Sequence, residues 1–314
     1  MSDHTPAQLV LMASVAQRYH LDRRSKVEIA EEFGLSRFKV ARLLDAARNS
    51  GLVRVEIRHD GAIDIDLSSR LRERFGLQHA VVVEVVDGDP DLLRRRLAAS
   101  TADLLAEIVV PQDVLGLAWA RSVSVLARML PRLPGTPVVQ LTGVLNFRGG
   151  DDSSVDIVRD AARATGGPAY VYFVPFVVPD AATARGLRRQ PEVARAFGQL
   201  PSVTRAVVGI GLWESGESML YNGADRQDHA VLERRGVCAE VSGVFLTAEG
   251  RPVSTGLTDR MIAVSAEQLR AIPDVIAVPY GVARATAVLA ALRSGLVNGI
   301  VTHASLARAV LDIA

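Results

Sequence analysis

Residues 25–53 read SKVEIAEEFGLSRFKVARLLDAARNSGLV, and this stretch decides the organisation of the first part of the chain. Ser25 and Glu28 have the spacing of a capping box, which predicts a helix that begins after Ser25. Gly34 predicts the end of that helix, because glycine tolerates the left-handed backbone of a tight turn. Ser36 is placed to cap a second helix. Two short helices joined by a glycine turn are typical of a helix-turn-helix.

The second predicted helix has one apolar face and one basic face. Its apolar positions recur at helical spacing, at Val40, Leu43, Leu44 and Ala47. A cationic helix start that follows such a turn can enter the major groove of DNA. The candidate DNA-binding residues are therefore Ser36, Arg37, Phe38, Lys39 and Arg42. The alternative is an ordinary helical hairpin whose Arg and Lys side chains only face solvent.

Composition bounds the class of protein. The chain has 314 residues, of which 49% are hydrophobic and 23% charged, so it can form a small domain and a larger one of about 250 residues. Its formal net charge is only +1. Residues 1–57 hold nine Lys or Arg and seven Asp or Glu, so any DNA affinity must come from local placement of charge.

The sequence also indicates a compartment. The single cysteine, Cys238, excludes an internal disulfide framework and suits a reducing cytoplasm. No apolar run has the length of a membrane span, and residues 1–6 lack a signal-peptide core. We expect a soluble cytoplasmic protein with no membrane partner.

Periodicity divides the chain into parts. Residues 7–20 predict an amphipathic helix that covers the helical pair, and alternation over residues 53–58 predicts a wing strand. We predict a helix-turn-helix DNA-binding domain over residues 1–58, a linker over 59–66, and an effector-binding and oligomerisation domain over 67–314.

The second domain alternates short apolar runs with helical segments. Near-continuous apolar strands separated by helices predict an α/β fold with a mostly parallel sheet buried on both faces. The predicted strands are 80–86, 114–119, 138–141, 169–173, 206–210, 275–278 and 299–302. The predicted helices are 66–75, 92–109, 155–165, 228–235, 283–293 and 305–311.

Ligands of such sheets bind beyond the carboxyl ends of the strands. Glycines, serines and arginines follow several of these ends, and such groups favour an anion or a polyhydroxylated molecule. The candidates include Arg121, Ser122, Gly143, Asn146, Gly209, Gly211, Gly281 and Arg284. Each has a structural alternative: Ser122 could only cap a helix, and Arg284 could only form a surface salt bridge.

Several segments resemble the SorC family of sugar-responsive bacterial transcription regulators, in matching order along nearly the whole chain. In the DNA-binding part they are EIAEEFGLSRFKVARLL (residues 28–44) and DAARNSGLVRVEI (45–57). In the second domain they include DVLGLAWARSV (113–123), PVVQLTG (137–143) and VVGIG (207–211). The resemblance implies a Rossmann-like effector domain related to sugar-phosphate isomerases, and an effector that is usually a phosphorylated sugar. It also implies homodimers or homotetramers on double-stranded operator DNA.

The resemblance assigns roles by position. Arg121 and Ser122 match a phosphate-holding loop, and Glu240 and Arg284 match an acidic and a basic ligand contact. Gln140, Gly143 and Asn146 match positions near the sugar. The chain departs from the family where Tyr280 replaces a glycine, Arg284 a lysine and His303 an aspartate; Trp119 and Arg121 also change the phosphate loop, and Ala239 replaces a glycine.

An enzyme is the main alternative. The only lysines are Lys26 and Lys39, so the second domain has no lysine for a Schiff base. The histidines lack metal-ligand spacing. We therefore expect no catalysis, no metal and no cofactor. Two rival functions stay open: a sugar-phosphate isomerase-like enzyme with an appended DNA-binding domain, and a constitutive DNA-binding oligomer without an effector.

Overall fold

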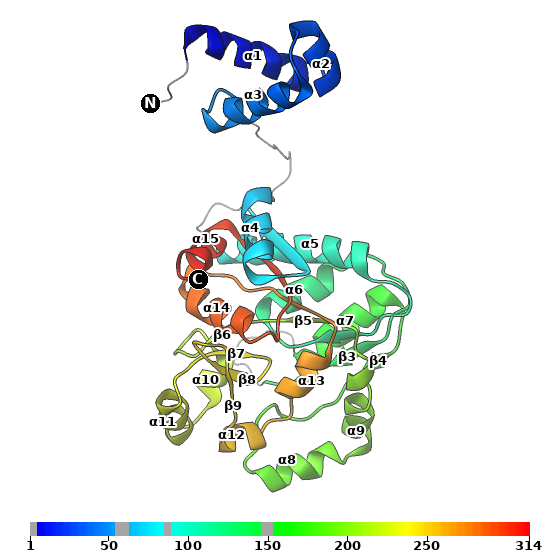
Figure 1. The fold of residues 1–314 in the computed structure, drawn as a ribbon. Coiled ribbons are helices and arrows are strands. Elements are labelled where there is room, and N and C mark those ends of the chain that lie inside the picture. Colours follow the sequence, from blue (N-terminus) through cyan, green and yellow to red (C-terminus); the bar gives the residue numbers. More distant parts are fainter. Residues whose placement is uncertain (1–4, 54–62, 85–88, 146–152) are drawn as a thin grey trace. The chain divides into compact units, whose positions relative to one another are not determined.

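The computed structural model describes residues 5–53, 63–84, 89–145 and 153–314. The chain divides into two compact units, residues 1–58 and 59–314 (Figure 1). Most of the predicted wing strand at 53–58, and the first half of the predicted linker, lie outside the described residues. Ile63 pairs with Val83 in an antiparallel bridge, and the next residue, Asp64, caps a helix. The second half of the predicted linker is therefore held by the larger unit.

The smaller unit contains the helices that the sequence predicts. They are α1 (Pro6–His20), α2 (Lys26–Phe33) and α3 (Arg37–Asn49). Ser25 and Glu28 form the capping box of α2, and Gly34 ends it with a φ of 63°. The Ser36 hydroxyl caps α3 by accepting a hydrogen bond from the backbone N–H of Lys39, 3.2 Å away.

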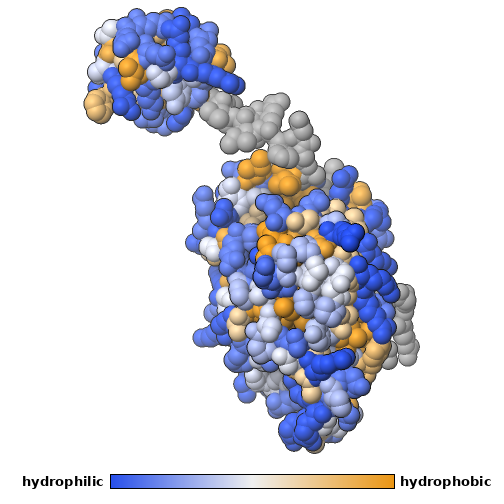
Figure 2. All heavy atoms as spheres, turned by 90° about the vertical axis from the view of Figure 1, so that its right-hand side faces the viewer, coloured by the Kyte–Doolittle hydropathy of each residue, from blue (hydrophilic) through white to orange (hydrophobic). Residues whose placement is uncertain are grey.

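One face of α3 forms part of the core of this unit. Its Val40, Leu44 and Ala47 are buried against Met12 and Val15 of α1, and Ile29 and Ala30 of α2 complete the cluster. The rest of the surface is largely polar, and Figure 2 shows hydrophobic residues on it only as separate small areas. The sequence therefore encodes a helical unit with one basic helix face left in solvent.

The larger unit contains two sheets. Its strands are β1 (His79–Val83), β2 (Leu115–Leu117), β3 (Val138–Gln140), β4 (Ala169–Tyr170), β5 (Arg205–Val208), β6 (Gly211–Leu212), β7 (Val237–Val241), β8 (Val244–Thr247), β9 (Pro252–Val253), β10 (Asp274–Ala277) and β11 (Gly299–His303). Its longer helices are α4 (Ile65–Phe75), α5 (Pro90–Ile108), α6 (Arg121–Met129), α7 (Ser154–Thr165), α8 (Ala181–Arg188), α11 (Arg226–Arg234), α14 (Ala285–Arg293) and α15 (Ala304–Asp312). Shorter helices are α9 (Pro191–Phe197), α10 (Met219–Gly223), α12 (Gly256–Asp259), α13 (Ala266–Ala271), and the 3-10 turns η1 (Leu200–Ser202) and η2 (Val282–Arg284).

The seven-stranded sheet confirms the predicted α/β class. Its order is β1-β11-β10-β5-β2-β3-β4, and its strand pairs in the described residues are all parallel. Read from β4 to β11 this is the Rossmann order, with β1 added at one edge. The chain reverses its direction of progress across the sheet between β2 and β5, so this is the topological switch point.

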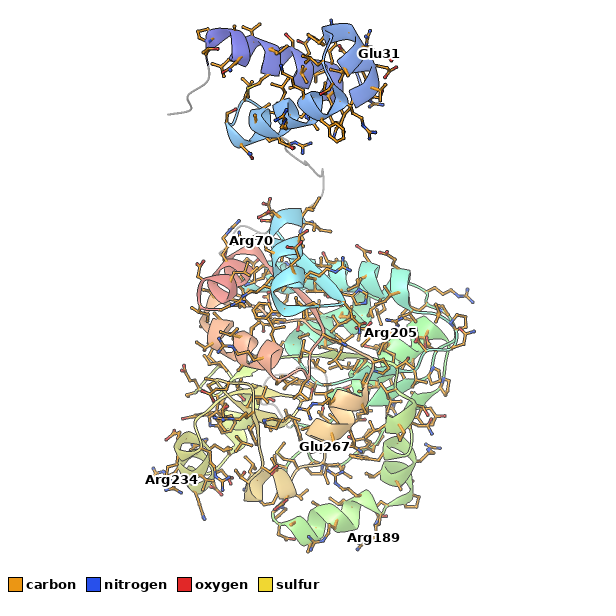
Figure 3. All side chains as sticks on the ribbon, in the orientation of Figure 1. Glu31, Arg70, Arg189, Arg205, Arg234 and Glu267 are labelled. Atoms are coloured by element: carbon orange, nitrogen blue, oxygen red, sulfur yellow. The ribbon has the colours of Figure 1, made fainter. Side chains whose placement is uncertain are left out.

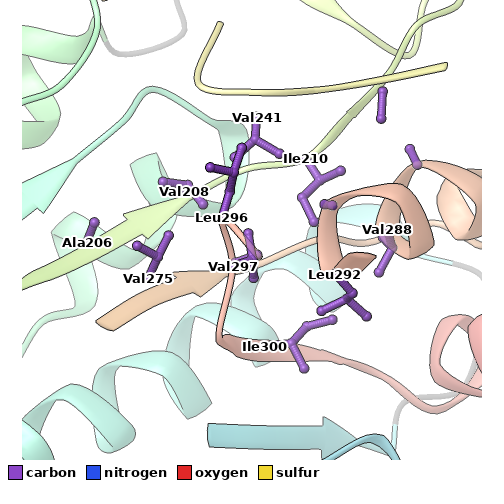
Figure 4. Packing of buried hydrophobic residues seen from close by; sticks show 14 of the residues in the cluster. Ala206, Val208, Ile210, Val241, Val275, Val288, Leu292, Leu296, Val297 and Ile300 are labelled. Atoms are coloured by element: carbon purple, nitrogen blue, oxygen red, sulfur yellow. The ribbon is translucent and has the colours of Figure 1, made fainter. Parts of the chain in front are cut away.

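Both faces of this sheet are buried, as the continuous apolar runs predict. Alternate residues of each strand join different clusters: Val207 packs with α5, α6 and α7, whereas Val208 packs with α4, α14 and α15. Figure 4 shows part of the cluster that contains Val208, to which α14 contributes Val288 and Leu292, β10 contributes Val275 and β11 contributes Ile300.

A four-stranded antiparallel sheet, in the order β6-β7-β8-β9, was not predicted. Its first and last strands have only two residues each, too few to show a period in the sequence. The turn between β7 and β8 does have a signal. Ser242 and Gly243 both have positive φ, 54° and 92°, which is the backbone of a two-residue hairpin turn.

An ion-pair network lies at the amino ends of the parallel strands. Arg205 of β5, labelled in Figure 3, pairs with Asp113 and with Asp274 of β10. Asp274 also lies 3.2 Å from Nε2 of His79. Both aspartates are buried, at 7% and 3% exposure. Arg205 therefore neutralises two carboxylates that the fold has removed from water.

Candidate functional site

A cavity lies at the topological switch point of the parallel sheet. The loops that follow β2, β5 and β10 form its floor, where ligands of open α/β sheets bind. Its walls come from α10, its preceding loop and the β7–β8 hairpin. It is lined by residues 119–122, 209–211, 217–220 and 278–280, together with Thr142, Leu145, Phe176, Glu240, Ser242 and Arg284.

Two predicted glycines allow the cavity to form. A Cβ atom on Gly209 would lie 2.6 Å from the Cβ of Ala120, so the loops after β5 and β2 can meet only with glycine there. A Cβ atom on Gly211 would lie 2.5 Å from Oε1 of Glu240. This second glycine lets a carboxylate lie directly against the backbone. Both residues were predicted from the sequence, and both line the cavity.

The start of α6 presents backbone donors to the cavity. Ala120 is the N-cap, and no side chain accepts a hydrogen bond from the first N–H groups of the helix. These N–H groups lie at the positive end of the helix dipole, which favours an anion. Ser122 is fully buried, and its hydroxyl donates to the carbonyl of Val278 at 2.8 Å. The alternative that Ser122 is an N-cap is therefore wrong. Both Ser122 and Arg121 line the cavity.

Arg284 lies on the opposite wall and is already paired. Its Nη1 donates to the carbonyl of Tyr280 at 2.8 Å, and its Nη2 lies 2.6 Å from Oε2 of Glu217. Only 13% of the Arg284 side chain is exposed, and its guanidinium lies over the Tyr280 ring, 5.3 Å from the ring centre. The Glu217 oxygen contacts Arg284 outside hydrogen-bond geometry. An anionic ligand would compete with Glu217 for this arginine.

The β7–β8 hairpin supplies acceptors for hydroxyl groups. Burial raises the pKa of Glu240 to about 7, although hydrogen bonds from Gly243 N–H and the Ser218 hydroxyl lower it again in part. The Gly243 N–H donates to Oε2 of Glu240 at 3.2 Å. The Ser242 hydroxyl is buried without a hydrogen-bond partner in the structure. A buried hydroxyl needs a polar partner, and this one lies in the cavity wall.

Two of the three residues expected near the sugar, Gln140 and Gly143, do not line the cavity. The Gln140 amide is buried and saturated: Nε2 donates to the carbonyls of Thr142 and Tyr172, and Oε1 accepts from Tyr172 N–H. Gly143 is needed for packing, since a Cβ there would lie 2.6 Å from Cα of Phe176. Neither residue lines the cavity, so both belong to the scaffold. Asn146 lies outside the described residues.

Gly281 does not line the cavity but shapes the turn that carries two of its lining residues. It has a φ of 88°, and its N–H donates to Nε2 of His303 at 3.1 Å. Its conformation lets the chain turn so that Tyr280 and Arg284 both reach the cavity wall.

Several lining residues were missed from the sequence. Thr142 accepts a hydrogen bond from the backbone N–H of Trp119 at 3.3 Å, which joins the loops after β3 and β2. Glu217 and Ser218 come from the segment before α10, where charged and hydroxyl residues are ordinarily solvated. The Ser242-Gly243 dipeptide is the one signal that could have indicated this wall, because it predicts a hairpin after Glu240.

The candidate DNA-binding face is on α3. Arg37, Phe38, Lys39 and Arg42 are all exposed. In the part of the chain that the structure describes, these three cationic side chains have no ion-pair partner, whereas Arg18 pairs with Asp22 and Glu32. Cations that no carboxylate neutralises are suited to phosphate.

The described residues contain neither a metal-binding cluster nor a membrane-spanning helix. No group of three or more His, Cys, Asp or Glu side chains is placed there to hold a metal ion. None of the described helices has the length and apolar character needed to cross a membrane.

The chain matches known regulators over its whole length. Residues 61–312 match the family model described as "Putative sugar-binding domain". The transcriptional regulator LsrR of Klebsiella pneumoniae is 30% identical over 314 residues, covering 98% of this chain and 94% of the relative. The chain belongs to the SorC family of sugar-binding transcriptional regulators. The SorC-family resemblance seen in the sequence is thereby confirmed.

Two solved structures of bacterial regulators share the fold. The full-length sorbitol operon regulator SorC from Klebsiella pneumoniae matches with a TM-score of 0.73 at 22% identity, covering 99% of both chains. A domain of a possible sugar-binding transcriptional regulator from Arthrobacter aurescens matches with a TM-score of 0.71 at 24% identity, covering 82% of this chain and 100% of that one. SorC-family membership thus agrees with the parallel sheet described above.

Proposed function

We propose that this protein is a transcriptional regulator of carbohydrate metabolism whose operator binding is controlled by a phosphorylated sugar or sugar alcohol in the switch-point cavity. The observation that carries the proposal is the cavity itself. It combines two arginines and a helix start with two carboxylates and a buried hydroxyl, in a domain of the sugar-binding family. The helix-turn-helix of residues 1–58 supplies the output.

The mixed chemistry favours a ligand with two kinds of group. Arg121, Arg284 and the first N–H groups of α6 suit a phosphate, since guanidinium forks and helix starts both bind anions. Glu240 and Ser242 suit hydroxyl groups, because a carboxylate accepts hydrogen bonds from a polyol. An unphosphorylated sugar would leave the arginines paired only with the protein.

A binding experiment tests this proposal. The full-length protein is titrated onto DNA from upstream of its own gene and neighbouring operons, at fixed salt, because phosphate contacts make affinity depend steeply on salt. Each sugar phosphate is compared with its unphosphorylated sugar. We expect specific binding that one phosphorylated compound changes. Binding no tighter than to random DNA contradicts the regulator, and a response only to the unphosphorylated partner contradicts the phosphate.

Binding without turnover is part of the proposal. The relatives named above are transcriptional regulators, which agrees with a non-catalytic role. Burial raises the pKa of the Cys238 thiol, the opposite of what a nucleophilic cysteine needs. Incubating the protein with the responding compound and recovering it unchanged would support binding alone, whereas isomerisation would establish the enzyme alternative.

The proposal includes an assembly and a compartment. We place the protein in the cytoplasm, with the operator, as a homodimer or homotetramer. Two α3 helices in a symmetric assembly read half-sites about one helical turn apart, or a multiple of that spacing. DNase footprinting of the operator tests this assembly. Protection of a palindrome with that spacing supports it, and protection of a single asymmetric half-site contradicts it.

Changing Glu217 to Gln should increase effector affinity by about tenfold. The substitution removes the negative charge that competes with the ligand phosphate for Arg284, and a tenfold change in affinity corresponds to about 1.4 kcal/mol. The effector concentration at half-maximal change in operator binding measures the effect. Weaker binding would show instead that Glu217 itself contacts the ligand.

Effector affinity should rise by about tenfold between pH 6 and pH 8. The pKa of Glu240 is raised to about 7, so the carboxylate that accepts ligand hydroxyls is the minor form at pH 6 and the major form at pH 8. A ligand phosphate also titrates in this pH range, so Glu240→Gln is the control. Its effector affinity should vary with pH only as far as the ionisation of the phosphate requires. Identical pH profiles for both proteins would exclude Glu240 as the acceptor.

A further inference from the structure

The outer surface of α3 carries one stripe of residues directly opposite its buried face. Val40, Leu44 and Ala47 point into the core, so the positions half a turn away form the outermost line of the helix. These positions are separated by four, three and four residues, and all of them are exposed: Phe38, Arg42, Asp45 and Asn49.

Phe38 is unusually exposed for a large hydrophobic side chain. Its exposed fraction is 81%, the highest of the large hydrophobic side chains that the structure describes. It contributes nothing to the core of its unit, which closes without it. It also lies among cationic side chains, with Arg37 and Lys39 beside it and Arg42 one turn further along the same stripe. An exposed aromatic ring on a helix surface that also carries cations without ion-pair partners fits a partner that is polyanionic outside and carries apolar groups within.

The major groove of DNA has that composition. Phosphates line its edges, and the 5-methyl group of thymine is the apolar group that it presents. Phe38 is the second residue of α3, and the first residues of a recognition helix reach the base edges. Because Arg42 lies on the same stripe, its guanidinium faces the same groove, where arginine binds guanine.

We infer that Phe38 is a specificity-determining residue that contacts the 5-methyl group of a thymine in each operator half-site. The inference rests on the proposed DNA-binding function. The contact removes one methyl group and one ring face from water, and it requires no hydrogen bond. It therefore distinguishes thymine from cytosine and also from uracil, which pairs identically but lacks the methyl group.

Uracil substitution isolates this contact. Full-length protein is used to select binding sequences from a pool of random DNA duplexes. Each thymine of the selected duplex is then replaced singly by deoxyuridine, and affinity is measured for the native protein and for Phe38→Ala. The native protein should lose about fourfold at one thymine per half-site, the effect of about 0.8 kcal/mol for one buried methyl group. Phe38→Ala should bind the thymine and uracil duplexes equally well.

Two variants serve as controls. Lys39→Ala removes an exposed cation next to Phe38 and should weaken binding to every duplex alike, with the uracil effect unchanged. Val10→Ala removes a hydrophobic side chain of α1 that is 66% exposed, and should leave both affinity and the uracil effect unchanged.

The outcomes separate the inference from the function on which it rests. If no single replacement of thymine by deoxyuridine lowers the affinity of the native protein, the methyl contact is wrong, although the protein still binds DNA sequence-specifically. A uracil effect of equal size in Phe38→Ala assigns the methyl contact to another residue and also overturns it. Selection that enriches no sequence overturns the DNA-binding function, and the contact with it.

Discussion

Replacing Arg205 with alanine should lower the free energy of unfolding of the larger unit by about 3–5 kcal/mol. Arg205 is the shared partner of Asp113 and Asp274, and both carboxylates are buried. The substitution leaves two desolvated aspartates with His79 as the neighbouring basic group. Such a loss is a large fraction of the total stability of a domain, which is about 5–15 kcal/mol.

The measurement has a convenient probe and a matched control. Both tryptophans of the chain, Trp119 and Trp213, belong to the larger unit, so fluorescence during urea unfolding reports that unit. Arg251→Ala is the control, because Arg251 pairs with Glu249 where both side chains are well exposed. We expect a change of less than about 0.5 kcal/mol there. An Arg205 variant that unfolds like this control would show that the network is not needed for stability.

Changing Arg284 to alanine should raise the effector concentration needed for a response by about 100-fold, while DNA binding without effector stays native. A buried guanidinium that forms charged hydrogen bonds to a phosphate contributes up to about 3 kcal/mol. Arg284 lies in the larger unit, remote in sequence from α3, so its loss leaves the DNA-reading helix unchanged. Fluorescence anisotropy of a labelled operator, titrated with effector, measures both quantities in one experiment.

Two further substitutions sharpen this test. Arg284→Lys keeps the charge but loses the planar fork, so it should respond at an intermediate concentration. Arg293→Ala removes an exposed arginine at the last residue of α14, the helix whose N-cap is Arg284, and should respond like the native protein. If Arg284→Ala responds at the native concentration, the phosphate is held elsewhere, and Arg121 becomes the candidate.

The sequence predicted the elements whose burial dictates their composition. The seven parallel strands were found because strands with both faces buried are continuous apolar runs, as in the predicted strands 206–210 and 275–278. The caps at Ser25 and Ser36 were found because each satisfies backbone donors a few residues away. Gly209 was found because a strand end at a switch point needs backbone space.

The rest depended on contacts between distant residues. The Ser122 hydroxyl was assigned to a helix start or a ligand, but its acceptor is the Val278 carbonyl, which only the folded sheet brings near. Gln140 was placed near the sugar by resemblance, yet its amide bonds to Tyr172 behind the cavity. The pairing of Glu217 with Arg284 became visible only in the folded structure. None of these pairings leaves a local pattern.

The hairpin turn at Ser242 and Gly243 places the ligand-contacting wall of the cavity in a different sheet from the one that forms its floor. The floor of the cavity is made by loops of the main sheet, where a larger residue at Gly209 would collide with Ala120. The wall that carries Glu240 belongs to a small sheet outside it. For the engineering of a biosensor, a library confined to this wall can vary ligand preference while the chain keeps its scaffold.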